Sequence, residues 1–186
     1  MDLKTKGFSL VELMVVMAVI TMVTLMILPN YREATDQFAL ERSANKLSQD
    51  IRQAAEMAMS LRELPDDRTV PKGGYGIFFD IGSPLEYKLY ADIDGNEYFN
   101  SGVDREIEGI PLERKVYIKE IEIDGSITIN AGSVNFKPPS PRVKITQINP
   151  PPEGVKNRMR ITLSLENDPN KERTIRVEKS GLVDLE

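Results

Sequence analysis

The feature that most constrains this chain is an apolar run from Phe8 to Leu28 that contains a single ionisable side chain, Glu12. As an α-helix, these 21 residues would rise about 31 Å, close to the roughly 30 Å hydrocarbon thickness of a bilayer. Secretory signal peptides have shorter apolar cores and a small-residue cleavage site, which the following sequence PNY does not supply. The run therefore predicts a membrane span at 8–28, in preference to a signal peptide or a buried core helix.

The residues around this run predict its orientation and raise a question about its carboxylate. Two basic residues, Lys4 and Lys6, and one acidic residue, Asp2, precede the run. Positively charged flanks stay in the cytoplasm. The N-terminus should therefore face the cytoplasm and the remainder should be extracytoplasmic. An ionisable residue within a span indicates a functional site and needs a partner. The next basic residue after Glu12 is Arg32, so the partner must be a cation that processing creates or another chain supplies.

The sequence GFSLVEL, which starts at Gly7, resembles the cleavage and methylation motif of type IV pilins and type II secretion pseudopilins. The resemblance implies that residues 1–7 are a leader peptide, that a prepilin peptidase cuts between Gly7 and Phe8, and that Phe8 is then N-methylated. It also implies that Glu12 pairs with the new amine of a neighbouring subunit during filament assembly. That amine would be the cation that pairs with Glu12.

The same resemblance implies a function, a location and partners. The chain would be a non-catalytic subunit of a type IV pilus or a type II secretion pseudopilus; the alternative is a DNA-binding minor pilin of a DNA-uptake (competence) pilus. It would be a single-pass inner-membrane protein that joins a filament. Its partners would be other pilin or pseudopilin subunits, prepilin peptidase, the inner-membrane assembly platform, membrane lipid and, in the alternative, DNA. Composition gives no support for catalysis, because histidine, cysteine and nucleophile motifs are absent from the sequence.

After Pro29 the pattern changes from apolar throughout to amphipathic. Apolar residues recur every three or four positions, which predicts one face of a helix. These are Tyr31, Ala34, Phe38, Ala44, Leu47, Ile51, Ala54, Ala55, Ala58 and Leu61. Glycine and proline are absent from there until Pro65, which ends the run. One long helix over 8–62 is expected, with a kink near Pro29 and with residues 30–62 as a spine that the rest of the chain covers.

The remainder of the chain is a series of short runs rich in β-branched and aromatic residues, separated by turn-forming residues. The runs are YGIFFDI, LEYKLYADI, ERKVYIKEIEID, SITI, SVNF, PRVKITQI, NRMRITLSLEN and ERTIRVEK. Apolar residues nearly alternate in some of them, which gives a strand one buried and one exposed face. No long helix separates the runs, so a mainly antiparallel sheet is expected. The predicted fold class is α+β, a long N-terminal helix packed on an extracytoplasmic β domain at 63–186.

This order of elements is similar to that of minor pseudopilins and minor pilins of the GspH/FimT type. The sequences IRV at 175–177 and GLV at 181–183 resemble the final strand pair of that family. The sequence VNF at 134–136 resembles a family element that normally contains a glycine shortly afterwards, whereas prolines stand here between 138 and 141. The chain has no cysteine and so no disulfide framework. Many major pilins of the family that it resembles carry a disulfide near the carboxyl end, so its absence favours a pseudopilin, a minor pilin or an anaerobic source.

A calcium site is one interpretation of the acidic sequence DIDGNE that starts at position 92, because calcium prefers hard oxygen ligands. The candidate ligands are Asp92, Asp94, Asn96 and Asp104. An EF-hand is excluded, because Glu97 takes the position of its glycine and Val103 that of its final glutamate. The alternative is a tight hairpin after a strand that ends at Ala91, with Asp94-Gly95 as the turn. No other cofactor is expected.

Charge is unevenly distributed along the chain. Residues 62–124 contain 8 Lys or Arg and 15 Asp or Glu, net −7, whereas residues 125–186 contain 10 and 7, net +3. Lys156, Arg158 and Arg160 occupy alternate positions and would share one face of a strand. Such a stripe can follow the phosphates of DNA. The alternative interpretation is an ordinary solvated strand face with interleaved acidic residues.

Overall fold

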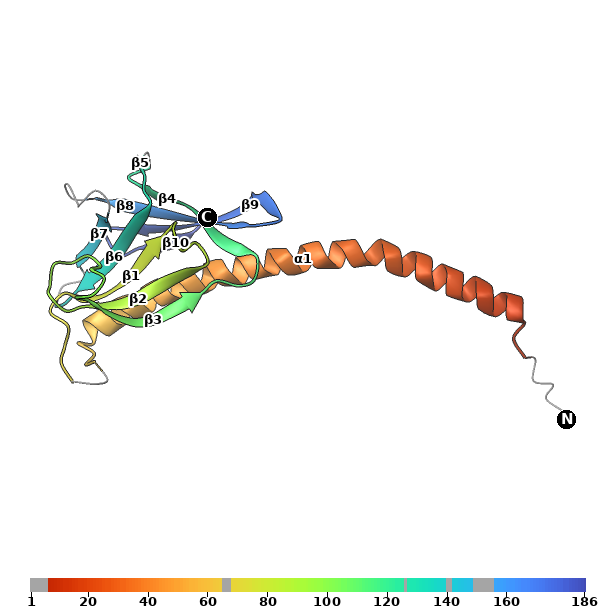
Figure 1. Cartoon of the computed structure of the whole chain (residues 1–186), viewed down its shortest axis with the longest axis horizontal. Coiled ribbons are helices and arrows are strands. Elements are labelled where there is room, and N and C mark those ends of the chain that lie inside the picture. Colours follow the sequence, from red (N-terminus) through yellow and green to blue (C-terminus); the bar gives the residue numbers. More distant parts are fainter. Residues whose placement is uncertain (1–6, 65–67, 126, 140–141, 149–155) are drawn as a thin grey trace. The chain divides into compact units, whose positions relative to one another are not determined.

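The computed structural model describes residues 7–64, 68–125, 127–139, 142–148 and 156–186, without the side chains of residues 28–32 and 142. The chain divides into two compact units, Met1–Phe38 and Ala39–Glu186. Helix α1 (Leu10–Met59) begins in the first unit and continues into the second (Figure 1). A single long helix is thus confirmed. The kink predicted near Pro29 falls among residues whose side chains are not described, and it stays a prediction.

In the first unit, the side chains of α1 between Leu10 and Ile27 are apolar except for Glu12, Thr21 and Thr24. The window Leu10–Ile27 is long and apolar enough to cross a membrane, and its side chains are all exposed. Its 18 residues span about 27 Å, close to the thickness of the hydrocarbon layer. Thr21 and Thr24 each donate a hydrogen bond of 2.8 Å to the carbonyl four residues earlier. Both hydroxyls are therefore satisfied within the helix, as a lipid environment requires.

In the second unit, α1 buries one face in the core, as predicted for the spine. The fully buried positions on this face are Ala44, Leu47, Ile51, Ala54 and Ala58. Three residues predicted for the same face are exposed: Ala34, Phe38 at 63% and Leu61 at 51%. Ala34 and Phe38 belong to the first unit, and Leu61 follows the end of the helix. The spine prediction is therefore confirmed for the central residues and wrong for these three, and the side chain of Tyr31 lies outside the described part of the chain.

The described residues that follow α1 form ten strands in two five-stranded sheets. The strands are β1 (Gly74–Asp80), β2 (Glu86–Asp92), β3 (Arg105–Pro111), β4 (Val116–Ile123), β5 (Ile127–Thr128), β6 (Ala131–Lys137), β7 (Arg142–Gln147), β8 (Arg158–Leu165), β9 (Asp168–Glu178) and β10 (Val183–Leu185). The first sheet has the order β3-β2-β1-β6-β7, and the second has the order β10-β9-β8-β4-β5. Neighbouring strands pair antiparallel. The α+β fold class and the antiparallel β domain are confirmed.

Alternation along the strands fills one core that both sheets share with the second half of α1. On β1, Tyr75, Ile77 and Phe79 are buried in this core. On β8, Ile161 and Leu163 are buried in it as well. Each buried aliphatic side chain stabilises the fold by about 2 kcal/mol relative to an exposed one. The helix is held against the sheets by this packing and by polar contacts such as the ion pair of Arg42 with Glu113 at 2.6 Å and the hydrogen bond from Arg52 to the carbonyl of Val183 at 2.8 Å. No disulfide contributes, since the chain has no cysteine.

Strand β3 and the connection before it differ from the sequence prediction. The sequence REIEGIP alternates too weakly to predict a strand, and pairing with β2, which places Ile110 opposite Tyr87, defines it instead. Strand β2 ends at Asp92 and β3 begins at Arg105. The tight hairpin predicted at Asp94-Gly95 is therefore wrong, because residues 93–104 form the connection.

Helix α1 ends at Met59, before the predicted end at residue 62. The N–H of Arg62 donates to the carbonyl of Met57 at 3.1 Å, and the N–H of Leu61 donates to that of Ala58 at 3.2 Å. These are the two hydrogen bonds of a Schellman motif. The motif places Leu61 in the left-handed region, with φ of 50°, a conformation that glycine adopts more readily.

We expect Leu61→Gly to raise the free energy of unfolding by about 1 kcal/mol, because it relieves the left-handed strain of a half-exposed side chain. Urea unfolding of the full chain in detergent, followed by circular dichroism, measures the change. Ser60→Gly is the matched control, since the N–H of Ser60 still makes the helical bond to Glu56 at 2.9 Å. The control should destabilise the protein. A decrease in stability for Leu61→Gly would contradict the interpretation.

Candidate functional site

The predicted processing site lies in non-helical chain immediately before α1. Apart from Gly7 and its two chain neighbours, no atom of the described residues lies within 4 Å of the position that a Cβ of Gly7 would take. Phe8 is 84% exposed. Both residues of the predicted cleavage site are therefore accessible to a peptidase along the described part of the chain.

Ser9 caps the N-terminus of α1. Its hydroxyl oxygen accepts a hydrogen bond from the N–H of Val11 at 3.3 Å, and its carbonyl accepts one from Leu13 at 3.1 Å. Glu12 follows Ser9 by three residues, which is the spacing of a capping box, and it lies in the first turn, where the helix dipole favours a negative charge. The sequence analysis missed this pattern, although the spacing is visible in SLVE. Glu12 thus has a local role available beside the predicted role in assembly.

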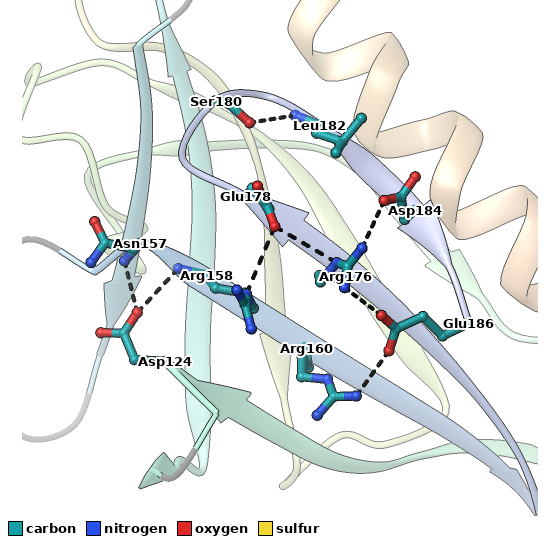
Figure 2. A network of polar contacts seen from close by, with 10 residues as sticks. All are labelled: Asp124, Asn157, Arg158, Arg160, Arg176, Glu178, Ser180, Leu182, Asp184 and Glu186. Carbon is teal, nitrogen blue, oxygen red and sulfur yellow. Dashed lines mark hydrogen bonds and ion pairs between the residues drawn. The ribbon is translucent and has the colours of Figure 1, made fainter.

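The predicted basic stripe is closely surrounded by carboxylates (Figure 2). Arg158 and Arg160 lie on β8. Arg158 pairs with Glu178 at 3.8 Å, and Arg160 pairs with Glu186 at 2.8 Å and with Glu122 at 3.7 Å. Both arginines of the stripe are therefore compensated within the chain.

Glu186 occupies a central position in this network. Arg160 lies directly opposite Arg176 on the neighbouring strand, and like charges in that arrangement repel. Glu186 bridges the two arginines at 2.8 and 2.6 Å. The hydrogen bond from Arg160 lowers the pKa of the Glu186 carboxyl, and the charges of both arginines act in the same direction.

Lys156, the third residue of the predicted stripe, is partly buried. DNA contact by Lys156, Arg158 and Arg160 stays a prediction, and this pairing does not favour it.

The three predicted aspartate ligands are brought together by the connection between β2 and β3. Carboxylate oxygens of Asp92, Asp94 and Asp104 lie within 4.8 Å of one another. Asp92 accepts hydrogen bonds of 2.7 Å from the N–H groups of Gly95 and Glu97. Asp104 accepts them from the N–H groups of residues 93 and 100 at 3.0 and 2.7 Å. Burial is the largest influence on both groups and raises the pKa of Asp92 and of Asp104.

Asn96, the fourth predicted ligand, has its side chain engaged in the loop. Its carbonyl oxygen accepts the N–H of Tyr98 at 2.9 Å, and its amide nitrogen donates to Asp94 at 2.8 Å. The sequence analysis missed Asn135 on β6, whose amide nitrogen donates to Asp92 at 3.2 Å. Nothing in the sequence connects position 135 with position 92, because only the pairing of β1, β2 and β6 brings them together.

Comparison with known proteins gives a decisive result for the N-terminal segment. The family model described as "Prokaryotic N-terminal methylation motif" matches residues 3–28. The chain carries a prokaryotic N-terminal methylation motif. The predicted resemblance to the type IV pilin superfamily is confirmed by this match. The motif includes Gly7, Phe8 and Glu12, and together with the apolar helix it fits a membrane-anchored protein with a C-terminal domain.

Two solved structures are similar to about four fifths of the chain. Both are of the type IV minor pilin FimU of Pseudomonas aeruginosa (strain PAO1), in space groups P21 and P65. The first is 11% identical with a TM-score of 0.47, covering 82% of this chain and 91% of that chain. The second is 10% identical with a TM-score of 0.44, covering 79% and 92%. No curated protein matches the chain.

We expect Glu186→Gln to lower the melting temperature slightly at neutral pH, because it leaves Arg160 and Arg176 opposed without their bridge. The pKa of Glu186 is lowered from 4.5 in the folded chain. Its contribution to stability is therefore complete above pH 4.5 and is lost as pH falls through the lowered pKa. The difference between variant and wild type should vanish in acid, and it should shrink in about 1 M salt.

Thermal unfolding followed by circular dichroism at several pH values measures this difference. Glu166→Gln is the control, because Glu166 is an exposed carboxylate after β8 whose side chain is not part of the Glu186 network. An equal loss of stability in both variants would show that Glu186 has no special role between the arginines.

Proposed function

We propose that this chain is a non-catalytic, pilin-like subunit of a type IV pilus or a type II secretion pseudopilus. It is inserted in the inner membrane as a single-pass precursor, cleaved by prepilin peptidase between Gly7 and Phe8, and methylated at Phe8. It then joins other pilin-like subunits at the inner-membrane assembly platform. The observation that supports this proposal is the match of the methylation motif to residues 3–28, which include the exposed apolar helix window Leu10–Ile27.

The two parts of this observation support each other physically. Side chains between Leu10 and Ile27 are exposed, so their surface needs lipid before assembly and the helices of neighbouring subunits afterwards. Cleavage after Gly7 creates an amine at Phe8, next to the first turn of the helix. An unpaired carboxylate within a span costs at least about 2.5 kcal/mol. Glu12 lies one turn along the same helix, so its natural partner is the amine of an axially offset neighbour.

Processing is tested by mass spectrometry of the chain produced with and without an active prepilin peptidase. With the peptidase, we expect the mature chain to begin at a singly methylated Phe8. Gly7→Val should remain uncleaved, because a side chain is added at the residue that precedes the cut. Ser9→Ala is the matched control on the other side of the cut and should be processed. A wild-type chain that still begins at Met1 beside an active peptidase would contradict the proposal.

Glu12→Gln separates charge pairing from helix capping. Glutamine can complete a capping box but cannot form an ion pair. We expect both Glu12→Gln and Glu12→Val to lower incorporation into sheared filaments by at least about tenfold. Either change removes the carboxylate, so the amine of the neighbouring subunit is left without its partner in the span. Glu12→Asp should have a milder effect.

Membrane insertion and cleavage should be unchanged in all three variants, and they serve as the internal control. Comparison of membrane and sheared filament fractions by immunoblot gives the measurement. Normal incorporation of Glu12→Gln together with loss for Glu12→Val would assign Glu12 to capping and would exclude charge pairing.

A further inference from the structure

We propose that the end of strand β2, the loop 93–104 and strand β6 form a site for a hard divalent cation of the calcium class. Its ligands are the carboxylates of Asp92, Asp94 and Asp104 and the side-chain carbonyl of Asn135. The site belongs to the β domain, and it does not depend on the proposed function of the N-terminal helix.

The geometry of the three carboxylates suits one calcium ion. Their ligand atoms all lie within 4.8 Å of one another. Calcium binds oxygens at 2.3–2.6 Å, so two ligands on opposite sides of the ion are at most about 5.2 Å apart. Asp92 and Asp104 are buried, whereas Asp94 is exposed. A single ion can therefore contact all three groups and still be reached from solvent on the side of Asp94.

The hydrogen bonds that Asp92 and Asp104 accept from the loop come from neutral backbone N–H groups. Lys137 pairs instead with Glu97 at 2.8 Å, and Lys144 pairs with it at 3.4 Å. Carboxylates that converge among neutral donors repel one another, and a divalent cation removes that repulsion.

Asn135 gives independent evidence of a ligand. The side chain points at Asp92, with its amide nitrogen 3.2 Å from a carboxylate oxygen. It is 1% exposed, and its carbonyl oxygen has no hydrogen-bond partner in the described part of the chain. Rotating the amide by 180° exchanges oxygen and nitrogen within the same volume. In that orientation the unpartnered oxygen faces Asp92 and becomes a ligand for an ion bound there.

Three buried hydroxyls lie on the same outward face of the first sheet. Those of Tyr90, Ser133 and Thr146 have no partner among the residues that the structure describes. The strand register places Ser133 opposite Thr146. It also places Gly76 between Tyr90 and Asn135, where a Cβ would lie 2.7 Å from the Tyr90 ring.

The loop covers this face of the sheet. Phe99 stacks on Phe78 with ring centroids 4.5 Å apart and meets the edge of Tyr90 at 5.1 Å. Lys144 also donates to the backbone carbonyl of Asn96 at 3.4 Å. These contacts therefore hold the loop that carries Asp94 and Asp104 against this face of the sheet.

Calcium binding is tested on the full chain in detergent, after treatment with a chelator. Titration calorimetry with calcium chloride should give a dissociation constant on the order of 10⁻⁴–10⁻³ M, as in extracellular calcium modules. The melting temperature should rise with calcium concentration, because the ion binds only the folded state. Magnesium should give a smaller shift, since it demands stricter geometry and loses water reluctantly.

Two variants and one control locate the site. Asp94→Asn, at an exposed position, should weaken calcium binding by about tenfold or more. Asn135→Asp adds a fourth carboxylate, so it should lower the melting temperature without calcium, bind calcium more tightly, and regain stability when calcium is added. Asp80→Asn is the matched control: Asp80 also accepts a backbone N–H, from Gly82 at 2.8 Å, but lies outside the cluster. Its calcium affinity should equal that of the wild type.

Three results would overturn the proposal. The first is no shift in the wild-type melting temperature at about 10 mM calcium, tenfold above the weakest extracellular modules. The second is equal affinity in Asp94→Asn and wild type, and the third is Asn135→Asp binding no more tightly. Any of these would assign the aspartates to bracing the loop by hydrogen bonds alone.

Discussion

Covering the apolar surface of α1 is the constraint on which the rest of this structure depends. In the second unit the chain supplies the cover itself, and Leu47 and Ile51 are fully buried. Between Leu10 and Ile27 the apolar side chains are exposed, so lipid or other helices must supply the cover. A single helix thus serves first as an anchor and then as the spine of a β domain. Its apolar content, high all round and later confined to one face, follows from this change of environment.

The start of the helix concentrates the polar chemistry of the anchor. Ser9 satisfies an N–H group of the first turn, and Glu12 places a negative charge where the helix dipole is positive. Cleavage after Gly7 would add a positive charge close by. The same carboxylate could therefore serve both helix capping and ion pairing. Its charge is already favourable at the start of the helix of a single chain, without a neighbouring subunit. Assembly would use a charge that the isolated helix already favours.

In the β domain, the two groups of charged side chains predicted to bind external partners have different surroundings. Arg158 and Arg160 face carboxylates, and Glu186 bridges Arg160 to Arg176. The aspartates of the loop 93–104 instead converge with neutral donors. The first arrangement is electrically balanced within the chain, whereas the second gains from an added cation. Comparable clusters of charge in a sequence can thus have opposite meanings, depending on the strands that lie opposite.

The sequence by itself determined the apolar helix, the methylation motif, the amphipathic spine and most of the strands, because each is encoded in the spacing of nearby residues. It also contained the Ser9–Glu12 capping pattern, which the sequence analysis missed. Only the tertiary structure decided that the strands form two sheets, that β3 exists through its pairing with β2, and that Asn135 meets Asp92. Periodicity reports which face of an element is buried, but it does not report which element covers that face. Contacts between residues distant in sequence, including those of the proposed cation site, are set by strand order and register.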